Sequence, residues 1–346
     1  MSYASTLNQL IAKQDLAQVE MLNLMRQVMT GELTPAQIAA LLIALRIKGE
    51  TVDEIAAAAM VMRELSSHVN VPQHEHLIDT CGTGGDGNQT FNVSTACAFV
   101  AAAAGAKVAK HGGRSVSSTS GSADVLEALG VNVGLQSEQV AICVDQIGIG
   151  FMFAPNHHSA MKYAAPVRRE LGVRTLFNLL GPLTNPANAK RQVMGVFSRE
   201  LTLKLAQVLQ QLGAEQVMVV HGADGMDEIS FSGDTYVAEL RDGKIREYTL
   251  NPQQFDMPVH QLAQIQIADA TSSKQMLLSV LQGEQTPARD IVLLNAGAAI
   301  YVSGLAADLA AGIQRAAQVI DAGLALEKLQ ALVALSQSLA SNTKSA

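Results

Sequence analysis

The sequence contains no tryptophan, few aromatic residues and few charged residues for its length. Of its 346 residues, 4% are aromatic and 16% are charged, whereas 48% are hydrophobic. Alanine, leucine, valine and glycine must therefore fill most of the interior, which suits helices packed against a buried sheet. A chain of this length can form two domains around a large core.

Basic residues are outnumbered, and long apolar segments are missing. The chain has 24 Lys and Arg against 31 Asp and Glu, a formal net charge of −7. Nonspecific nucleic-acid binding needs a basic surface, so we expect no nucleic-acid partner. The most apolar segment, residues 96–109, is too short to cross a bilayer, and the N-terminus lacks the pattern of a secretion signal. We therefore expect no membrane partner.

Cysteine is sparse, and none of its positions forms a C-x-x-C motif. The three cysteines are Cys81, Cys97 and Cys143. Isolated cysteines in odd number are typical of reduced, buried thiols in a cytoplasmic protein. We therefore expect a cytoplasmic location.

The first 70 residues carry strong helix signals. Residues 34–37 (Thr-Pro-Ala-Gln) form a capping box with proline at the first helical position, and Gly49 ends that helix. Ile43 and Ile47 widen the apolar stripe beyond one helix face. This excess could contact the larger domain or a second subunit, and contact with the larger domain is the simpler expectation.

Beyond residue 71, strand and helix patterns alternate, which predicts a mostly parallel sheet covered by helices. The expected strands are 77–80, 107–110, 131–133, 149–153, 192–197 and 216–221, followed by a hairpin of 236–240 and 244–248. The expected helices are 94–104, 122–129, 137–147 and 201–212, and helices should fill most of 272–281, 289–303 and 306–341. Helical residues 158–171 should return to the N-terminal helices. We expect a helical domain of residues 1–70, completed by about 158–186, and an α/β domain of 71–157 and 187–346.

The loop after the first strand fits the dinucleotide pattern G-x-G-x-x-G at Gly82–Gly87. That fingerprint needs an acidic residue about 20 positions on, yet residues 88–123 contain no Asp or Glu. Asp86 would also repel a pyrophosphate unless a cation lay between them. The glycines instead allow backbone N–H groups to approach an anion, with Asn92, Ser94 and Thr95 adding donors at a helix N-terminus.

A second strand leads into a helix through Lys110–Ser122, which carries two cations and many hydroxyl groups. Such a composition could also form a flexible linker. Two successive strand–loop–helix segments of this kind favour a pocket for a polyphosphorylated substrate. Adjacent carboxylates follow a later strand, in Asp224–Glu228. Beside a phosphate pocket they become candidate Mg²⁺ ligands, because Mg²⁺ prefers hard oxygen atoms.

Together these segments resemble the anthranilate phosphoribosyltransferase family. The motifs that carry the resemblance are 79–87, 90–95, 110–112, 120–124, 153–155, His158, 166–171, 177–186 and Asp227-Glu228. The resemblance implies a small all-α N-terminal domain, a larger α/β domain, Mg²⁺ (two ions per subunit) and homodimerisation through the helical domain. It implies transfer of the phosphoribosyl group of 5-phosphoribosyl 1-pyrophosphate (PRPP) to the amino group of anthranilate, in tryptophan biosynthesis.

The resemblance also implies roles for individual residues. PRPP would be bound by Gly82, Gly85, Asp86, Thr90, Asn92, Val93, Ser94, Thr95, Lys110, His111, Gly112, Gly113, Arg114, Ser115, Val116, Ser117, Ser118 and Ser122. Anthranilate would be bound by Gly82, Gly113, Arg168, His111, His158 and Pro182. Mg²⁺ would be bound by Ser94, Asp227 and Glu228.

One position departs from the family pattern. The family carries asparagine, which contacts anthranilate, where this chain has Gly113. A transferase of the same fold with another aromatic acceptor therefore remains an alternative, and an NAD(P)-dependent oxidoreductase is a more remote one. No nucleophile motif stands out, so the expected catalysis relies on positioning and on cations at the leaving pyrophosphate. His111 and His158 are acceptor-side candidates for removing the amine proton.

Overall fold

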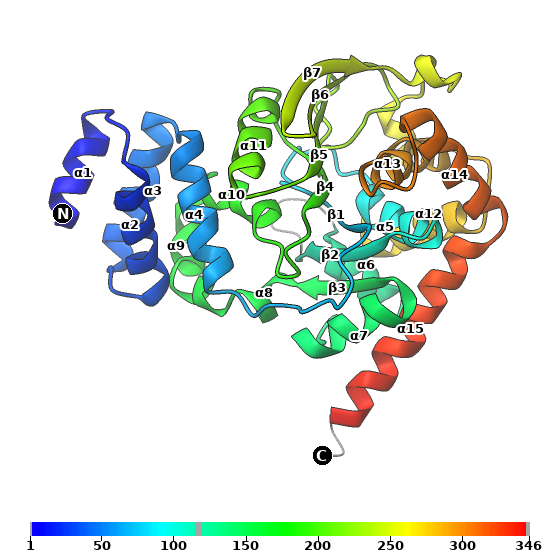
Figure 1. The fold of residues 1–346 in the computed structure, drawn as a ribbon, viewed down its shortest axis with the longest axis horizontal. Helices are drawn as coiled ribbons and strands as arrows, with labels where there is room; N and C mark the ends of the chain where they lie inside the picture. Colours follow the sequence, from blue (N-terminus) through cyan, green and yellow to red (C-terminus); the bar gives the residue numbers. More distant parts are fainter. Residues whose placement is uncertain (1, 115–119, 344–346) are drawn as a thin grey trace.

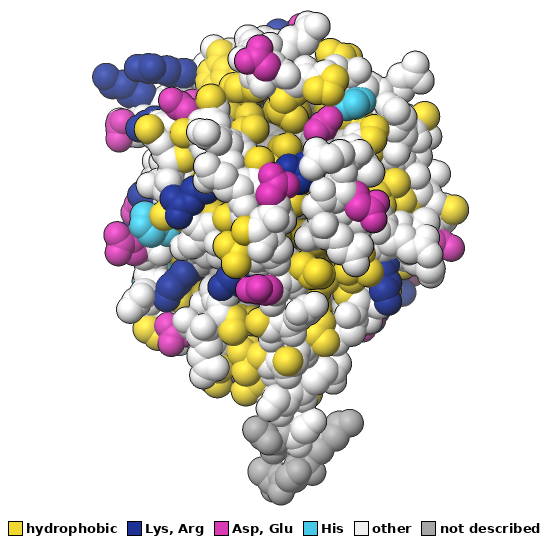
Figure 2. Space-filling view, turned by 90° about the vertical axis from the view of Figure 1, so that its right-hand side faces the viewer, with side chains coloured by type: hydrophobic (Ala, Val, Ile, Leu, Met, Phe, Trp, Pro, Cys, Tyr) yellow, Lys and Arg dark blue, Asp and Glu magenta, His cyan; other side chains and the backbone are white. Residues whose placement is uncertain are grey.

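The structure is a computed structural model that describes residues 2–114 and 120–343 (Figure 1). Four helices at the N-terminal end pack beside a seven-stranded sheet, which helices cover on both faces. No helix in the described part of the chain is long and apolar enough to span a membrane. On the face opposite the N-terminal helices, Figure 2 shows basic and acidic side chains interspersed among apolar ones.

The N-terminal helices are α1 (Tyr3–Ile11), α2 (Gln18–Thr30), α3 (Pro35–Lys48) and α4 (Val52–Glu64). The predicted capping box is confirmed: the Gln37 N–H donates to Thr34 Oγ1, and the Thr34 N–H donates to Gln37 Oε1. Gly49 ends α3 with φ of +88°, a conformation that favours glycine. These local signals place the helix ends where the sequence predicts them.

Short helical segments from the middle of the chain complete the core of this bundle. They are α8 (Ala154–His157), η1 (Ser159–Tyr163), α9 (Ala165–Leu171), α10 (Phe177–Leu180) and η2 (Gly181–Leu183). Helix α9 contacts α3, and α10 contacts α4. The hydrophobic cluster of the bundle includes Val167, Phe177 and Leu180 and continues to one face of the sheet. The predicted return of this segment to the N-terminal helices is confirmed.

The expected contact of Ile47 with the larger domain is wrong. Its side chain is 68% exposed, whereas Leu41, Leu42 and Leu45 of the same helix are buried. The stripe of α3 that faces the core is already filled by these leucines, so Ile47 extends from the opposite side.

The sheet has the strand order β3-β2-β1-β4-β5-β6-β7. Its strands are β1 (Leu77–Gly82), β2 (Lys107–Gly112), β3 (Ile149–Phe153), β4 (Arg191–Gly195), β5 (Gln216–Gly222), β6 (Thr235–Arg241) and β7 (Lys244–Leu250). The first five strands of this order, from β3 to β5, pair in parallel with their neighbours. Strand β6 pairs antiparallel with both β5 and β7. The predicted mostly parallel sheet and its terminal hairpin are confirmed. Asp242 and Gly243 both have positive φ, as a two-residue hairpin turn requires.

The sheet separates two hydrophobic cores. Along β5, Val217 and Val219 point into the core shared with the N-terminal helices, while Met218 and Val220 point into the other. The covering helices are α5 (Val93–Ala103), α6 (Ser122–Ala128), α7 (Ser137–Ile147), α11 (Glu200–Gln211), α12 (Ala270–Leu281), α13 (Pro287–Val302), α14 (Leu309–Asp321) and α15 (Leu324–Thr343). Helix α11 lies between the sheet and α4 (Figure 1).

One predicted strand is wrong. Residues 131–133 form no strand: Val131 and Val133 are buried, but the Val131 N–H donates to Leu126 O and the Asn132 N–H to Ser336 Oγ. Their apolar pattern reflects burial without a neighbouring strand. The helices expected to fill most of 306–341 are α14 and α15, which Gly323, with φ of +75°, separates.

Candidate active site

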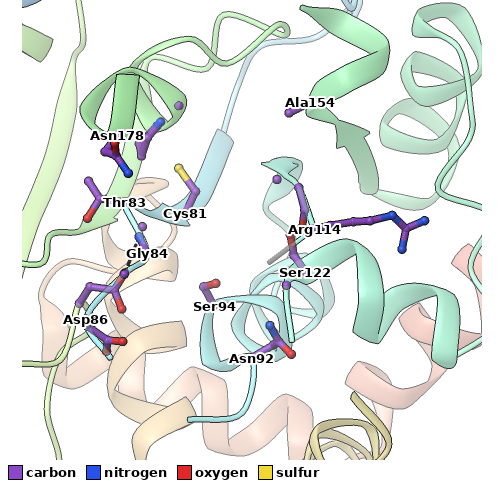
Figure 3. Close-up of a pocket in the computed structure, with 18 of the residues that line it drawn as sticks. Cys81, Thr83, Gly84, Asp86, Asn92, Ser94, Arg114, Ser122, Ala154 and Asn178 are labelled. Atoms are coloured by element: carbon purple, nitrogen blue, oxygen red, sulfur yellow. Dashed lines mark hydrogen bonds between the residues drawn. The ribbon is translucent and has the colours of Figure 1, made fainter. Parts of the chain in front are cut away.

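A cavity of about 920 Å³ opens where the parallel strands β1, β2 and β4 end (Figure 3). Strand β1 pairs with β2 on one side and with β4 on the other. The chain continues from β1 through β2 to β3 on one side, and then returns to β4 on the other side. Such a position is where open α/β sheets bind ligands, because the loops after neighbouring strands separate there. In Figure 3, Thr83, Gly84, Asp86 and Asn178 lie along one side of the cavity, and Ser122 and Arg114 along the other.

The glycine-rich loop after β1 is tied to two neighbouring segments. The Thr83 N–H donates to Gly195 O at 2.8 Å, and the Gly84 N–H donates to Asp227 Oδ2 at 2.8 Å. Gly84 and Gly85 have φ of +64° and +78°, so the turn needs residues without a Cβ. The loop therefore brings backbone amides and the carboxylates of a distant segment to the same wall.

The N-terminus of α5 is built around Asn92. The Asn92 side-chain oxygen accepts from Ser120 Oγ at 3.1 Å and from Ser273 Oγ at 2.7 Å. Within the first turn of the helix, the Ser94 N–H donates to Glu228 Oε1 at 3.1 Å. A helix N-terminus favours negative charge, so this end stabilises a carboxylate and suits an anionic ligand.

Lys110 brings a nearly buried positive charge to the floor of the cavity. Its side chain is 3% exposed, and its Nζ donates to Thr80 O and to Ser94 Oγ. Beneath it, Asp79 is fully buried and accepts from the His111 N–H and from Asn185 Nδ2. Burial raises the pKa of Asp79, and the positive charge of Lys110 opposes that shift.

Three carboxylates meet at the wall of the cavity: Asp86, Asp227 and Glu228. Burial, with the charge of Asp86, raises the pKa of Asp227 to about 7. Burial, with the charge of Asp227, raises the pKa of Glu228 to about 8. Crowded buried carboxylates of this kind are relieved by a divalent cation, so the donor set fits Mg²⁺.

The metal site would be incomplete without other ligands. In residues 2–114 and 120–343, no group of three or more His, Cys, Asp or Glu is arranged as a ready metal site. Mg²⁺ commonly takes one or two protein carboxylates and completes its shell with water and substrate phosphates. Asp227 and Glu228 would supply the protein oxygens.

The opposite part of the cavity is less charged. It is lined by His111, Pro182, Arg168 and Phe177, with the Arg168 guanidinium carbon 5.3 Å from the Phe177 ring centroid. Burial, with the neighbouring His158, lowers the pKa of His111 to about 3, so its ring is neutral near pH 7. Burial also lowers the pKa of Arg168, and a guanidinium stays protonated at neutral pH, so Arg168 is a cation of this part. An apolar wall beside a planar guanidinium suits an aromatic carboxylate.

Comparison with known proteins identifies the family. A family model described as "Glycosyl transferase family, a/b domain" matches residues 74–326, and one described as "Glycosyl transferase family, helical bundle domain" matches residues 4–66. An anthranilate phosphoribosyltransferase from Methylobacillus flagellatus is 67% identical over 331 residues, covering 96% of this chain and 97% of the relative. The chain belongs to the anthranilate phosphoribosyltransferase family. The resemblance proposed from the sequence motifs is confirmed.

Solved members of the anthranilate phosphoribosyltransferase family share the fold. The structure from Thermus thermophilus is 42% identical, with a TM-score of 0.91, covering 96% of this chain and 99% of that chain. The Saccharomyces cerevisiae enzyme in complex with PRPP and Mg is 28% identical, with a TM-score of 0.87, covering 97% of this chain and 98% of that chain. The predicted fold class, a small helical domain and a larger α/β domain, is confirmed.

Most residues that the family resemblance nominated line the cavity. They are Gly82, Gly85, Asp86, Thr90, Asn92, Val93, Ser94, Lys110, His111, Gly112, Gly113, Arg114, Ser122, Arg168, Pro182, Asp227 and Glu228. Ser115, Val116, Ser117 and Ser118 lie outside the described residues.

Three nominated residues lie differently. Thr95 is fully buried behind the cavity wall. His158 is also behind the wall, 5.1 Å from His111 between ring centroids. Arg114 lines the cavity, but its guanidinium pairs with Glu127 and Asp124, and Figure 3 shows its side chain pointing away from Ser94 and Asn92.

The structure adds residues that the sequence reasoning missed. Thr83, Ser120, Asn178 and Arg174 line the cavity, and Asp79 supports it from below. Thr83, Ser120 and Asn178 fall inside the family motifs, so their motif membership was a signal that could have nominated them. Arg174 lies in the connector between α9 and α10. In the sequence it belongs to a cluster of charged residues that is typical of a solvent-exposed surface, so nothing marked it as a site residue.

Proposed function

We infer that this chain transfers the phosphoribosyl group of PRPP to the amino group of anthranilate, giving N-(5-phosphoribosyl)anthranilate and pyrophosphate in tryptophan biosynthesis. The observation that carries the inference is that one cavity joins an anion-binding part to a less charged part with a planar cation. The first part contains Lys110 and the N-terminus of α5, and the second contains Arg168.

The anion-binding part would hold the donor substrate. Lys110, the glycine-rich loop and the start of α5 would bind the phosphates, and Asp227 and Glu228 would hold Mg²⁺, with Ser94 as a further ligand. When bound, Mg²⁺ neutralises charge on the departing pyrophosphate. Lys110 adds a second positive charge where negative charge develops on the leaving group.

The less charged part would orient the acceptor. Arg168 would bind the anthranilate carboxylate through two nitrogens, and His111 and Pro182 would flank the ring. A neutral aromatic amine needs alignment with the sugar more than activation. With a pKa of about 3, His111 is a poor proton acceptor near pH 7 and is better suited to lining the pocket. We therefore assign no general base.

The direct test mixes the purified chain with PRPP, anthranilate and Mg²⁺ and follows the loss of anthranilate fluorescence. Loss that requires all three components supports the proposal. No loss with anthranilate, together with product formation from another aromatic amine, would establish the alternative acceptor.

Arg168→Ala is expected to raise the KM for anthranilate by about 10- to 100-fold, because a charge-assisted hydrogen bond contributes roughly 1.5–3 kcal/mol. The KM for PRPP should change by less than about twofold. Glu170→Ala is the control, since Glu170 is an exposed neighbour on the same helix and does not line the cavity. Steady-state constants that rise equally for both substrates would contradict the assignment.

Gly113→Asn is expected to lower the KM for anthranilate by about 2- to 10-fold, because one added hydrogen bond contributes roughly 0.5–1.5 kcal/mol. A Cβ at Gly113 would meet no described atom within 4 Å, and the residue has no positive φ, so the side chain can be accommodated. Gly113→Ala adds the Cβ without the amide and should leave both KM values unchanged. Equal constants for the two variants would exclude a role for the amide.

Further features of the proposal concern the whole molecule. We propose two Mg²⁺ ions per subunit, the domain boundaries given above, and a cytoplasmic location, which the three free and buried cysteines support.

We also propose a homodimer through the helical domain. Ile11, Val19 and Ile47 of that domain are 66%, 63% and 68% exposed and offer an apolar surface. Sedimentation velocity measures the oligomeric state, and a monomer at micromolar concentration would contradict the dimer.

A further inference from the structure

Arg174 connects the acceptor side of the cavity to the glycine-rich loop. It lies in the segment between α9, which carries Arg168, and α10, which carries Phe177. Its side chain is exposed and lines the cavity. No role described above uses this side chain.

The guanidinium of Arg174 is held between the loop and an aromatic ring. Its Nη2 donates to Gly85 O, and its Cζ lies 4.0 Å from the centroid of the Phe197 ring. The Phe197 N–H donates to Thr83 Oγ1 at 3.2 Å. One planar cation and one aromatic residue therefore contact the same loop at Gly85 and at Thr83.

The main chain of Arg174 is fixed as well. Arg46 of α3 donates from Nη1 to Arg174 O. The next residue, Thr175, donates its N–H to Asn178 Oδ1 at 2.9 Å. The main chain at Arg174 is thus anchored to the helical bundle. This fixes the position from which its side chain extends to the loop.

The peptide after Gly85 is the part of the loop that most needs such a restraint. Gly84 and Gly85 both adopt positive φ and carry no Cβ, so their backbone has wide conformational freedom. A carbonyl oxygen turned toward phosphate groups would repel them. Because a trans peptide is planar, holding Gly85 O against Arg174 directs the Asp86 N–H the opposite way.

We propose that Arg174 is a positioning residue for the donor substrate. It binds the carbonyl oxygen of Gly85, keeps that oxygen from the phosphates and fixes the orientation of the Gly85–Asp86 peptide. The kinetic part of this proposal rests on the proposed transferase function.

The kinetic test compares Arg174→Ala, Arg174→Lys and Arg199→Ala. Arg199 is the matched control, because it is exposed, stacks 3.9 Å from the Tyr236 ring centroid and does not line the cavity. Arg174→Ala should raise the KM for PRPP by about tenfold, which is the effect of losing one charge-assisted hydrogen bond. The KM for anthranilate should change by less than about twofold. Arg174→Lys should fall between, since lysine keeps a charged donor but loses the planar stack.

A second test needs no activity. An endoproteinase that cuts before aspartate can cleave the Gly85–Asp86 bond of the substrate-free protein. Cleavage there should be faster in Arg174→Ala than in the wild type or Arg199→Ala, as measured by mass spectrometry. An unchanged cleavage rate, or a KM for PRPP within about twofold of wild type, would overturn the proposal. If the wild type fails to use anthranilate, the transferase function falls, and the cleavage rate still decides the role of Arg174.

Discussion

Asp227→Asn is expected to raise the Mg²⁺ concentration needed for half-maximal activity by about tenfold or more, and to lower kcat/KM on the order of 100-fold. Asparagine keeps the size of the side chain and an oxygen that can accept from the Gly84 N–H. It removes a negative charge from the wall that also contains Glu228 and Asp86. The substitution therefore removes the proposed metal ligand and leaves the packing unchanged.

The measurement is a Mg²⁺ titration of the initial rate at saturating PRPP. Binding of Mn²⁺ by electron paramagnetic resonance, with PRPP present, reports the same site without turnover. Asp224→Asn is the control from the same segment, because Asp224 accepts from Ser230 Oγ at 2.6 Å and does not line the cavity. An unchanged titration for Asp227→Asn would remove this residue from the metal site.

Gly195→Ala is expected to abolish the active arrangement of the carboxylates. A Cβ at Gly195 would lie 1.5 Å from Asp227 O and 2.4 Å from Asp227 C, so the main chain at Asp227 must move. The strand cannot yield instead, because Gly195 is paired with Gly82 of β1 and with Val220 of β5. We expect a loss in stability of roughly 1–3 kcal/mol, as for other insertions into close-packed sites.

The same displacement should raise the Mg²⁺ requirement of Gly195→Ala as Asp227→Asn does, since both affect the position or charge of one carboxylate. Gly233→Ala is the matched control: its Cβ meets no described atom within 4 Å, and it has no positive φ. Thermal unfolding and a Mg²⁺ titration measure both effects. Wild-type values for Gly195→Ala would contradict the close approach of β4 to the carboxylate segment.

Much of the site could be predicted because its signals are local. The glycines of the loop after β1, the hydroxyl-rich segment after β2 and the adjacent carboxylates each stand within a few residues of a strand end. The C-terminal ends of neighbouring parallel strands share one edge of a sheet, which is why these segments meet. The cavity contains residues of all three.

What could not be predicted depends on contacts between distant segments. Whether Val131 and Val133 form a strand depends on a neighbouring strand, which is absent at that position of the described structure. Whether Ile47 is covered depends on how α3 is oriented, and the bundle leaves it exposed. Arg174 and Gly85 are 89 residues apart, and no pattern in the sequence links them.

The amino-acid sequence by itself determined the order and type of most elements, the two candidate phosphate-binding segments after β1 and β2, and the family. It could do so because caps, glycines and apolar periodicity act over a few residues. The tertiary structure alone decided that Gly195 makes room for Asp227, that His158 lies behind His111, and that Arg114 pairs with Glu127. These relations arise only when the sheet brings remote segments into contact, where packing and burial rather than local preference set each side chain.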